Sequence, residues 1–245
     1  MNAPVPQLIV EEIDSTNAEA RRRAEAGETG PLWIAARRQT AGRGRYGRTW
    51  DSAPQNLAAT LLTTTAKPPA EAAQISFVAA LAVFELAEAY VPRALLALKW
   101  PNDVLVDGAK VSGVLVESGP AGSDLWLAVG VGVNLASHPE ETERPATHLG
   151  AHLSPERARP PSPEEALSEL AGAFERWRDI WERNGFAPIR RAWTERAASL
   201  GAPVTARLGS ETLCGVAEAM EADGALRLRL ADGSVRRITA GDVFS

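Results

Sequence analysis

The sequence predicts a mixed α/β protein followed by a small all-β unit. Over residues 1–200, short apolar runs typical of strands alternate with longer segments in which apolar residues recur every three or four positions, as in helices. Further along the chain the period changes to two, because Leu226, Leu228 and Leu230 alternate with arginines. We therefore expect two domains, residues 1–200 and residues 201–245.

The strands of the first domain are predicted from short runs rich in β-branched and apolar residues. Asp107-Gly108, between two such runs, is a dipeptide typical of a hairpin turn. Gly130 and Gly132 lie two positions apart, so they open the same face of one strand. The predicted strands are Leu8–Ile13, Leu32–Ala36, Asn56–Thr65, Leu95–Trp100, Val104–Val106, Val111–Glu117 and Leu125–Leu135.

Capping residues and helix breakers predict the helices. Thr16 and Glu19 have the spacing of a capping box. Ser162 is expected to cap another helix, after a polar, proline-rich surface excursion over residues 137–163. An apolar stripe along that helix is expected to pack in the core: Leu167, Leu170, Phe174, Trp177 and Trp181. The other predicted helices are residues 18–26, Ala70–Tyr90 and a short helix that carries Ile189, Trp193 and Ala197.

Composition argues against several classes of protein. A net charge of −5 argues against general nucleic-acid binding, which normally requires a basic domain. Cys214 is the only cysteine, which excludes an internal disulfide and fits a reducing cytoplasm. The first residues do not resemble a secretory signal, and no stretch reaches the roughly 18 uncharged apolar residues of a membrane helix. We therefore expect a cytoplasmic protein that does not bind membranes.

Positive charge is concentrated in one segment. Residues 37–48 carry five arginines and no acid. Within and just beyond this segment, residues 42–50 read GRGRYGRTW. The glycines allow a close approach of the backbone to a ligand, and arginine stays charged at any physiological pH. Such a loop suits a phosphate or a phosphate-bearing intermediate.

Two other interpretations of this loop fit its residues less well. The G-x-G-x-x-G dinucleotide fingerprint requires a helix directly afterwards and an acid about 20 residues further on. Here residues 50–54 break a helix, and Lys67 stands where the acid should be. An RNA-binding Arg-Gly tract would normally be repeated and disordered, whereas this loop is single and flanked by predicted strands. The anion-binding interpretation is therefore preferred.

Three other segments put polar groups beside predicted strands. Residues 99–103 read KWPND and present an amide and a carboxylate at a strand exit, although a plain turn would look the same. Lys110 stands at the mouth of an apolar strand, where an ordinary surface lysine is the alternative. Residues 130–134 read GVGVN, which suits a ligand lying on a sheet, although glycines can also mark a bulge.

In their order and spacing, these segments resemble the biotin protein ligase family. The matching segments are Ser15-Thr16-Asn17, Gln39 with the following GRGRYGRTW, KWPND, KVSGVLVE at residues 110–117 and GVGVN. The resemblance implies a core similar to class II aminoacyl-tRNA synthetases, with a mixed sheet and flanking helices, and an SH3-like β-barrel over residues 201–245. Members that also repress transcription carry an N-terminal winged helix-turn-helix. Because 14 residues precede Ser15, the resemblance is to the ligase-only class, and DNA binding is not expected.

The resemblance also implies a reaction and its residues. Biotin would react with ATP, aided by Mg²⁺, to give biotinyl-AMP, and biotin would then pass to a lysine of a biotin carboxyl carrier protein domain, such as a subunit of acetyl-CoA carboxylase. The catalytic residues would be Lys110, Arg43 and Asp103, with Asp103 acting either as the base or beside Mg²⁺. The biotin site would comprise Ser15, Thr16, Asn17, Gln39, Gly42, Arg43, Gly44, Arg45, Lys110 and Gly113. The ATP and adenylate site would comprise Arg43, Arg45, Arg48, Trp50, Asn102, Lys110 and Asn134.

Two alternatives and one open question follow from the same resemblance. A lipoate or octanoate ligase shares the superfamily and the adenylation step. A non-catalytic sensor of biotin or nucleotide would keep the binding residues without the reaction. The arginine-rich loop is expected to be mobile before ligands bind and ordered afterwards. Many family members form homodimers, and the sequence leaves monomer and dimer open.

Overall fold

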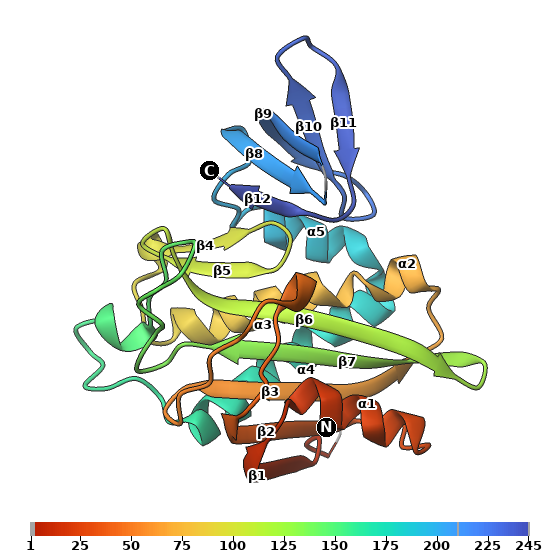
Figure 1. The fold of residues 1–245 in the computed structure, drawn as a ribbon, viewed down its shortest axis with the longest axis vertical. Coiled ribbons are helices and arrows are strands. Elements are labelled where there is room, and N and C mark those ends of the chain that lie inside the picture. Colours follow the sequence, from red (N-terminus) through yellow and green to blue (C-terminus); the bar gives the residue numbers. More distant parts are fainter. Residues whose placement is uncertain (1–2, 210, 245) are drawn as a thin grey trace.

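The computed structural model describes residues 3–209 and 211–244, which form two sheets and their covering helices (Figure 1). The larger sheet has seven strands in the order β1-β2-β3-β7-β6-β5-β4. Only β1 and β2 pair in parallel, and all its other neighbours are antiparallel. Its strands are β1 (Gln7–Ile13), β2 (Leu32–Gln39), β3 (Leu57–Thr65), β4 (Leu96–Lys99), β5 (Asp103–Val106), β6 (Ala109–Ala121) and β7 (Asp124–Val133). The predicted mixed sheet is confirmed.

Alternate residues of β2 show how helices cover both faces of this sheet. Ile34 packs with Ala20 of α1 (Thr16–Glu25) in a small apolar cluster. Trp33 and Ala35 point to the other face, into the main core with α3 (Ile75–Glu88) and α4 (Pro163–Asn184). A strand buried on both faces needs apolar side chains at every position, as the run Leu32–Ala36 provides.

The first helix begins differently from the prediction. Ser15, not Thr16, is the N-cap, because its hydroxyl accepts the amide of Ala18 at 3.4 Å. Thr16 instead donates its hydroxyl to Gln39 Oε1 at 3.1 Å. The capping box predicted from Thr16 and Glu19 is therefore wrong, because Glu19 pairs with arginines on its own helix. Because Thr16 does not cap the helix, its side chain can contribute to the site described below.

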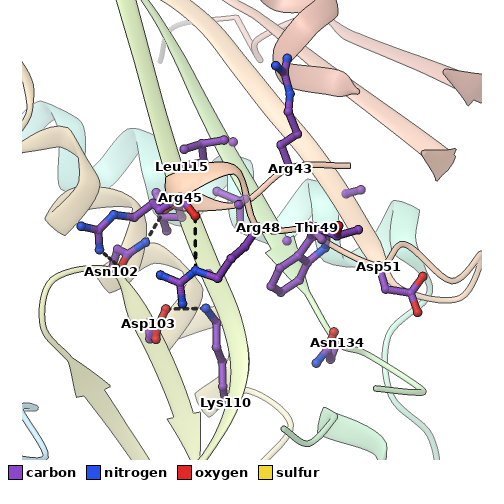
Figure 2. Close-up of a pocket in the computed structure, with 18 of the residues that line it drawn as sticks. Arg43, Arg45, Arg48, Thr49, Asp51, Asn102, Asp103, Lys110, Leu115 and Asn134 are labelled. Carbon is purple, nitrogen blue, oxygen red and sulfur yellow. Dashed lines mark hydrogen bonds and ion pairs between the residues drawn. The ribbon is translucent and has the colours of Figure 1, made fainter. Parts of the chain in front are cut away.

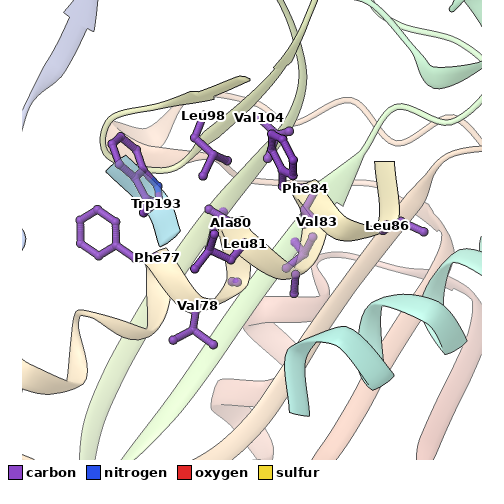
Figure 3. Close-up of a cluster of buried hydrophobic side chains, with 14 of the residues drawn as sticks. Phe77, Val78, Ala80, Leu81, Val83, Phe84, Leu86, Leu98, Val104 and Trp193 are labelled. Carbon is purple, nitrogen blue, oxygen red and sulfur yellow. The ribbon is translucent and has the colours of Figure 1, made fainter. Parts of the chain in front are cut away.

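The predicted helix Ala70–Tyr90 is divided in two, α2 (Pro69–Ala72) and α3. At the junction, backbone hydrogen bonds reach back three residues instead of four, for example from Gln74 to Glu71 at 2.9 Å. Residues 69–88 are apolar and long enough to span a membrane, but 72% of their most apolar stretch is buried inside the protein. Figure 3 shows α3 packed among core side chains that include Leu98 and Trp193, so this stretch is a core helix.

The helices that follow confirm one capping prediction and correct another boundary. Ser162 and Glu165 form the capping box of α4, as predicted. Within the predicted stripe, all but Trp177 are buried, and Trp177 packs against the core while its indole donates to Glu85 at 3.0 Å. The next helix, α5 (Phe186–Thr194), ends before Ala197, which instead bridges to Leu98 of β4. The prediction that Ala197 is helical is therefore wrong.

The turn and the second sheet agree with the two-residue period. Asp107 and Gly108 both have positive φ, 50° and 76°, which is the backbone of a tight hairpin turn. The second sheet is antiparallel, in the order β11-β10-β9-β8-β12, and lies at one end of the molecule (Figure 1). Its strands are β8 (Pro203–Leu208), β9 (Glu211–Met220), β10 (Leu226–Leu230), β11 (Val235–Ile238) and β12 (Asp242–Phe244).

Candidate active site

A pocket of about 340 Å³ opens on the α1 face of the large sheet, beneath residues Gly42–Trp50, which we call the arginine loop. All the predicted site residues line this pocket except Gly42. Gly42 lies behind it, where a Cβ atom would overlap the carbonyl of Trp50 and come within 2.9 Å of Gln39 Nε2. Gly42 thus allows the close approach of backbone that shapes the pocket wall.

One end of the pocket is lined by uncharged, hydrogen-bonded side chains, and one of them, Asn17, donates its amide to the carboxylate of Glu117 at 2.8 Å. Gln39 Oε1 accepts the backbone amide of Thr16 at 2.8 Å, and Gln39 Nε2 donates to Ser52 at 2.8 Å. Thr60 of β3 donates its hydroxyl to Asn17 Oδ1 at 2.7 Å. Ser15, Thr16 and Asn17 are all buried. Such fixed, neutral donors and acceptors suit a polar ligand ring that carries no charge.

Two glycines on β7 make room for the side chains that form this end and the pocket's centre. A Cβ at Gly130 would overlap Asn17 Oδ1, and a Cβ at Gly132 would overlap the indole of Trp50. A Cβ at Gly113 of β6 would lie 3.5 Å from the same indole. The prediction that Gly130 and Gly132 open one face is confirmed. Their role is to admit Asn17 and Trp50 onto the sheet.

The arginine loop folds back on itself over the pocket. The amide of Gly44 donates to the carbonyl of Arg48 at 2.7 Å, and that of Trp50 donates to Gly42 at 3.0 Å. Its tip, Arg45–Gly47, turns with positive φ at Tyr46 (57°) and Gly47 (73°). The loop is therefore a small hairpin whose backbone bonds are satisfied locally, which leaves its arginines free to reach elsewhere.

The other end of the pocket is charged. Lys110 Nζ lies 2.7 Å from Asp103 Oδ1, and Arg45 donates to Asn102 Oδ1 at 3.0 Å (Figure 2). Asp103 is only 7% exposed, so its carboxylate is shielded from water, whereas the Lys110 side chain is 30% exposed. Arg43 does not join it. Its side chain is exposed and extends away from Lys110 and Asp103 (Figure 2).

The C-terminal sheet supplies part of the charged end, which the sequence did not indicate. Arg45 donates to the carbonyl of Gly241 at 3.1 Å, and Arg48 pairs with Asp242 of β12. Burial is the largest influence on the pKa of Asp242 and raises it, but the hydrogen bond from Arg48 and the charges of Arg48, Arg144 and Arg45 together hold that pKa below its ordinary value. The arginine loop is thereby tethered to the second sheet.

Arg144 and Lys99 add further positive charge beside Asp103. Arg144, from the predicted surface excursion, lies 3.5 Å from Asp103 Oδ2. Lys99 is buried, and its pKa falls to about 8 through burial first and the nearby charge of Arg144 second. Burial is the larger cause of this shift, and the repulsion by Arg144 adds to it because a second cation lies close to Lys99. An anionic ligand would offset the positive charge of this cluster.

Asn134 has a mainly supporting position. Its side-chain amide donates to the carbonyl of Thr147 at 2.9 Å, and its backbone amide donates to Val111 at 2.8 Å. These bonds tie the segment after β7 to β6, and the Asn134 side chain still borders the pocket. Trp50 Nε1 is buried without a hydrogen-bond partner in the part of the chain that the structure describes.

Comparisons with known proteins agree with this arrangement. Residues 10–134 match the biotin/lipoate A/B protein ligase family, and residues 199–245 match the biotin protein ligase C terminal domain. The chain is 46% identical over 234 residues to a biotin–[acetyl-CoA-carboxylase] ligase of Paracoccus denitrificans, which covers 94% of this chain and 97% of that relative. The chain belongs to the biotin protein ligase family.

Solved structures of this family share the fold over almost the whole chain. The biotin protein ligase of Aquifex aeolicus in complex with biotin and ATP superposes with a TM-score of 0.78 at 27% identity, covering 98% of this chain and 97% of that one. The biotin protein ligase of Leishmania major in complex with biotinyl-5-AMP gives a TM-score of 0.63 at 25% identity, covering 97% and 100%. Those two proteins bind biotin together with ATP, and the acyl-adenylate, respectively.

Proposed function

We propose that this chain is an ATP-dependent ligase that forms biotinyl-AMP and transfers biotin to a lysine of a biotin carboxyl carrier domain, for example in acetyl-CoA carboxylase. The observation that carries the proposal is the division of one pocket into a neutral end at Ser15–Asn17 and a cationic end at Lys110. Biotin has the same division, with an uncharged ureido ring and a carboxylate. The relatives described above support the choice of biotin and ATP.

In the first step the biotin carboxylate attacks the α-phosphorus of ATP, and pyrophosphate leaves with the bonding electron pair. Two anions must approach one another, so preorganised cations should contribute most of the stabilisation. Lys110 has the position for this role, because it lies between the charged end and the pocket's centre, with its Nζ 5.7 Å from the Trp50 ring centroid. Arg43 would have to turn inward to contribute, and its side chain is exposed and therefore has room to do so.

In the second step the carrier's lysine amine attacks the acyl carbon, and AMP leaves. The amine must lose a proton, and Asp103 is the proposed acceptor. Its Oδ1 is held by Lys110 at 2.7 Å, whereas Oδ2 has only Arg144 at 3.5 Å, too long for a good hydrogen bond. Oδ2 is therefore the oxygen open to the incoming amine.

The donor set fits Mg²⁺ carried by the nucleotide. Across residues 3–209 and 211–244, no group of three His, Cys, Asp or Glu side chains could hold a metal. Mg²⁺ commonly binds through substrate phosphates with one or two carboxylates, and Asp103 would be the protein carboxylate here. When bound, the ion would neutralise charge on the phosphates of ATP.

Location and assembly complete the proposal. A cytoplasmic location fits the single cysteine and the burial of the one apolar helix in the core. DNA binding is not part of the proposed function, and a footprint on promoter DNA at physiological salt would contradict this. Sedimentation at assay concentrations would distinguish an active monomer from an active homodimer.

Pyrophosphate exchange into ATP tests the substrate. The purified protein is incubated with ATP, Mg²⁺ and labelled pyrophosphate, together with biotin, lipoate or octanoate. The proposal expects exchange that depends on biotin and falls to background with the other two acids. Equal exchange with lipoate or octanoate would favour that ligase activity instead. Absence of exchange with every acid, combined with tight biotin binding, would favour a non-catalytic sensor.

A further inference from the structure

The segment between β7 and α4 brings one arginine into the pocket. Its residues 145–147 run beside Lys110: the amide of Lys110 donates to Pro145 at 2.8 Å, and that of Thr147 donates to the Lys110 carbonyl at 2.9 Å. This pairing fixes the backbone directly after Arg144. A segment that looked like a surface excursion is therefore anchored at the charged end.

The guanidinium of Arg144 is buried and incompletely bonded. Its side chain is 16% exposed, and within the described residues its Nε and Nη2 atoms are buried without a hydrogen-bond partner. The two nearest carboxylates, Asp103 and Asp242, lie at 3.5 and 3.6 Å. Each of them has a closer cation, Lys110 and Arg48 respectively. A buried donor that makes no hydrogen bond costs free energy. In a binding pocket, a ligand often supplies the missing acceptor.

The ring of Phe244 helps to hold the guanidinium of Arg144 in place. The guanidinium carbon of Arg144 lies 4.0 Å from the ring centroid of Phe244 in β12. When the flat face of a guanidinium packs on an aromatic ring, the N–H groups in its plane can still donate hydrogen bonds. A planar fork of this kind suits the oxygens of a phosphate.

The position of Arg144 relative to Lys110 indicates which phosphates it would meet. Asp103 Oδ1 holds Lys110 and Oδ2 faces Arg144, so the two cations contact different oxygens of one carboxylate. Under the proposed function Lys110 meets the α-phosphate, where the acyl-adenylate forms. Arg144 also lies 3.6 Å from Asp242 of the second sheet, which belongs to the charged end, so we place Arg144 on the side of the leaving group.

We propose that Arg144 binds the β- and γ-phosphates of ATP and holds the pyrophosphate until it departs. The inference rests on the proposed function, because it takes Lys110 as the α-phosphate contact. Arg144 would thus serve adenylate formation and its reversal, and would influence transfer of biotin from the finished adenylate to the carrier only weakly, through its long contact with Asp103 Oδ2.

Pyrophosphorolysis of synthetic biotinyl-AMP isolates this contact. Inorganic pyrophosphate attacks the α-phosphorus, the bond to the acyl oxygen breaks, and ATP and biotin are released. For Arg144→Gln we expect the KM for pyrophosphate to rise roughly tenfold to a hundredfold, since a charge-assisted contact to an anion contributes about 1.5–3 kcal/mol. Transfer from synthetic biotinyl-AMP to a carrier domain, without pyrophosphate, should stay within about twofold of wild type. Arg144→Lys should recover part of the loss.

Arg207→Gln is the matched control. Arg207 lies 4.3 Å from the same Phe244 ring, but it pairs with Glu143 and is half exposed. If Arg144 acted only by supporting Phe244 and the segment around it, both variants would change the same parameters. An unchanged KM for pyrophosphate in Arg144→Gln, or an equal loss of the transfer step, would overturn the inference. Absence of ATP formation by the wild-type protein would instead overturn the proposed function beneath it.

Discussion

The two ends of the pocket are constructed in different ways. The neutral end comes from α1, β2 and β3, and its side chains are held by short hydrogen bonds, from Thr16 to Gln39, from Thr60 to Asn17, from Asn17 to Glu117 and from Gln39 to Ser52. The charged end is assembled from the arginine loop, the turn between β4 and β5, the segment after β7 and the C-terminal sheet. Two of its ion pairs are long, Arg144 with Asp103 at 3.5 Å and with Asp242 at 3.6 Å, and two nitrogens of Arg144 have no hydrogen-bond partner within the described residues. The comparison indicates a rigid end that selects the ligand and a less constrained end where charge changes during the reaction.

Removing Lys110 should have the largest effect and should leave the neutral end untouched. For Lys110→Ala we expect the rate of biotin-dependent pyrophosphate exchange to fall by ~10²–10³, which is typical for the loss of one preorganised donor. The KM for biotin should change little. Circular dichroism and thermal melting provide the folding control, and a near-normal exchange rate would remove Lys110 from the mechanism.

A small addition at the neutral end should instead change the KM for biotin. Gly130→Ala puts a methyl group where Asn17 Oδ1 now lies. Overpacking of this kind costs about 1–3 kcal/mol, so we expect the KM for biotin to rise roughly tenfold to a hundredfold.

Gly172→Ala in α4 is the control for that change. Its added Cβ would meet only the Arg176 side chain at 3.6 Å, and alanine favours a helix. Kinetic constants should therefore match wild type. A normal KM for biotin in Gly130→Ala would show that the contact between Asn17 and β7 does not shape the biotin end.

Arg45 links the loop to both Asn102 and Gly241, so its loss should open the charged end after adenylation. Arg45→Gly should still form biotinyl-AMP but release it about ten to a hundred times sooner, from the loss of a charge-assisted contact. Free adenylate acylates accessible lysines on any protein. With biotin, Mg-ATP and serum albumin, a blot should show more biotin on albumin than with wild type. Equal labelling despite adenylate formation would mean that Arg45 does not retain the product.

The smallest expected effect concerns Asp242. Asp242→Asn removes its ion pair with Arg48, which is worth at most about 1 kcal/mol because Arg48 is 43% exposed. The pKa of Asp242 is lowered in the folded protein, so the pair stabilises above the unfolded aspartate value of about 3.9. That stabilisation is lost as the pH falls through the folded value. The melting temperatures of wild type and variant should differ at neutral pH and converge in acid; a constant difference would contradict this origin.

The sequence predicted the neutral end better than the charged end. Ser15, Asn17, Gln39 and the paired glycines lie in short segments whose order and spacing are informative in themselves. Thr60 was missed because a threonine within a strand has a sufficient explanation in β-propensity alone.

Arg144 and Asp242 were missed for a different reason. Arg144 lies in a polar segment without periodicity, and Asp242 is far along the chain in another sheet. The pairing of residues 145–147 with Lys110 brings Arg144 to Asp103, and the docking of the second sheet brings Asp242 to Arg144. The same limit explains the helix errors: α5 ends early because Ala197 finds a strand partner distant in sequence, which no local pattern reports.

The most direct test of the central claim is mass spectrometry of an isolated carrier domain after incubation with the protein, ATP, Mg²⁺ and biotin. If the pocket binds biotin at its neutral end and ATP at its cationic end, the mass of the carrier domain should rise by one biotinyl group on one lysine, with release of AMP. Lipoate in place of biotin should give no addition. A carrier that stays unmodified, or one that accepts lipoate equally well, would contradict the proposed function.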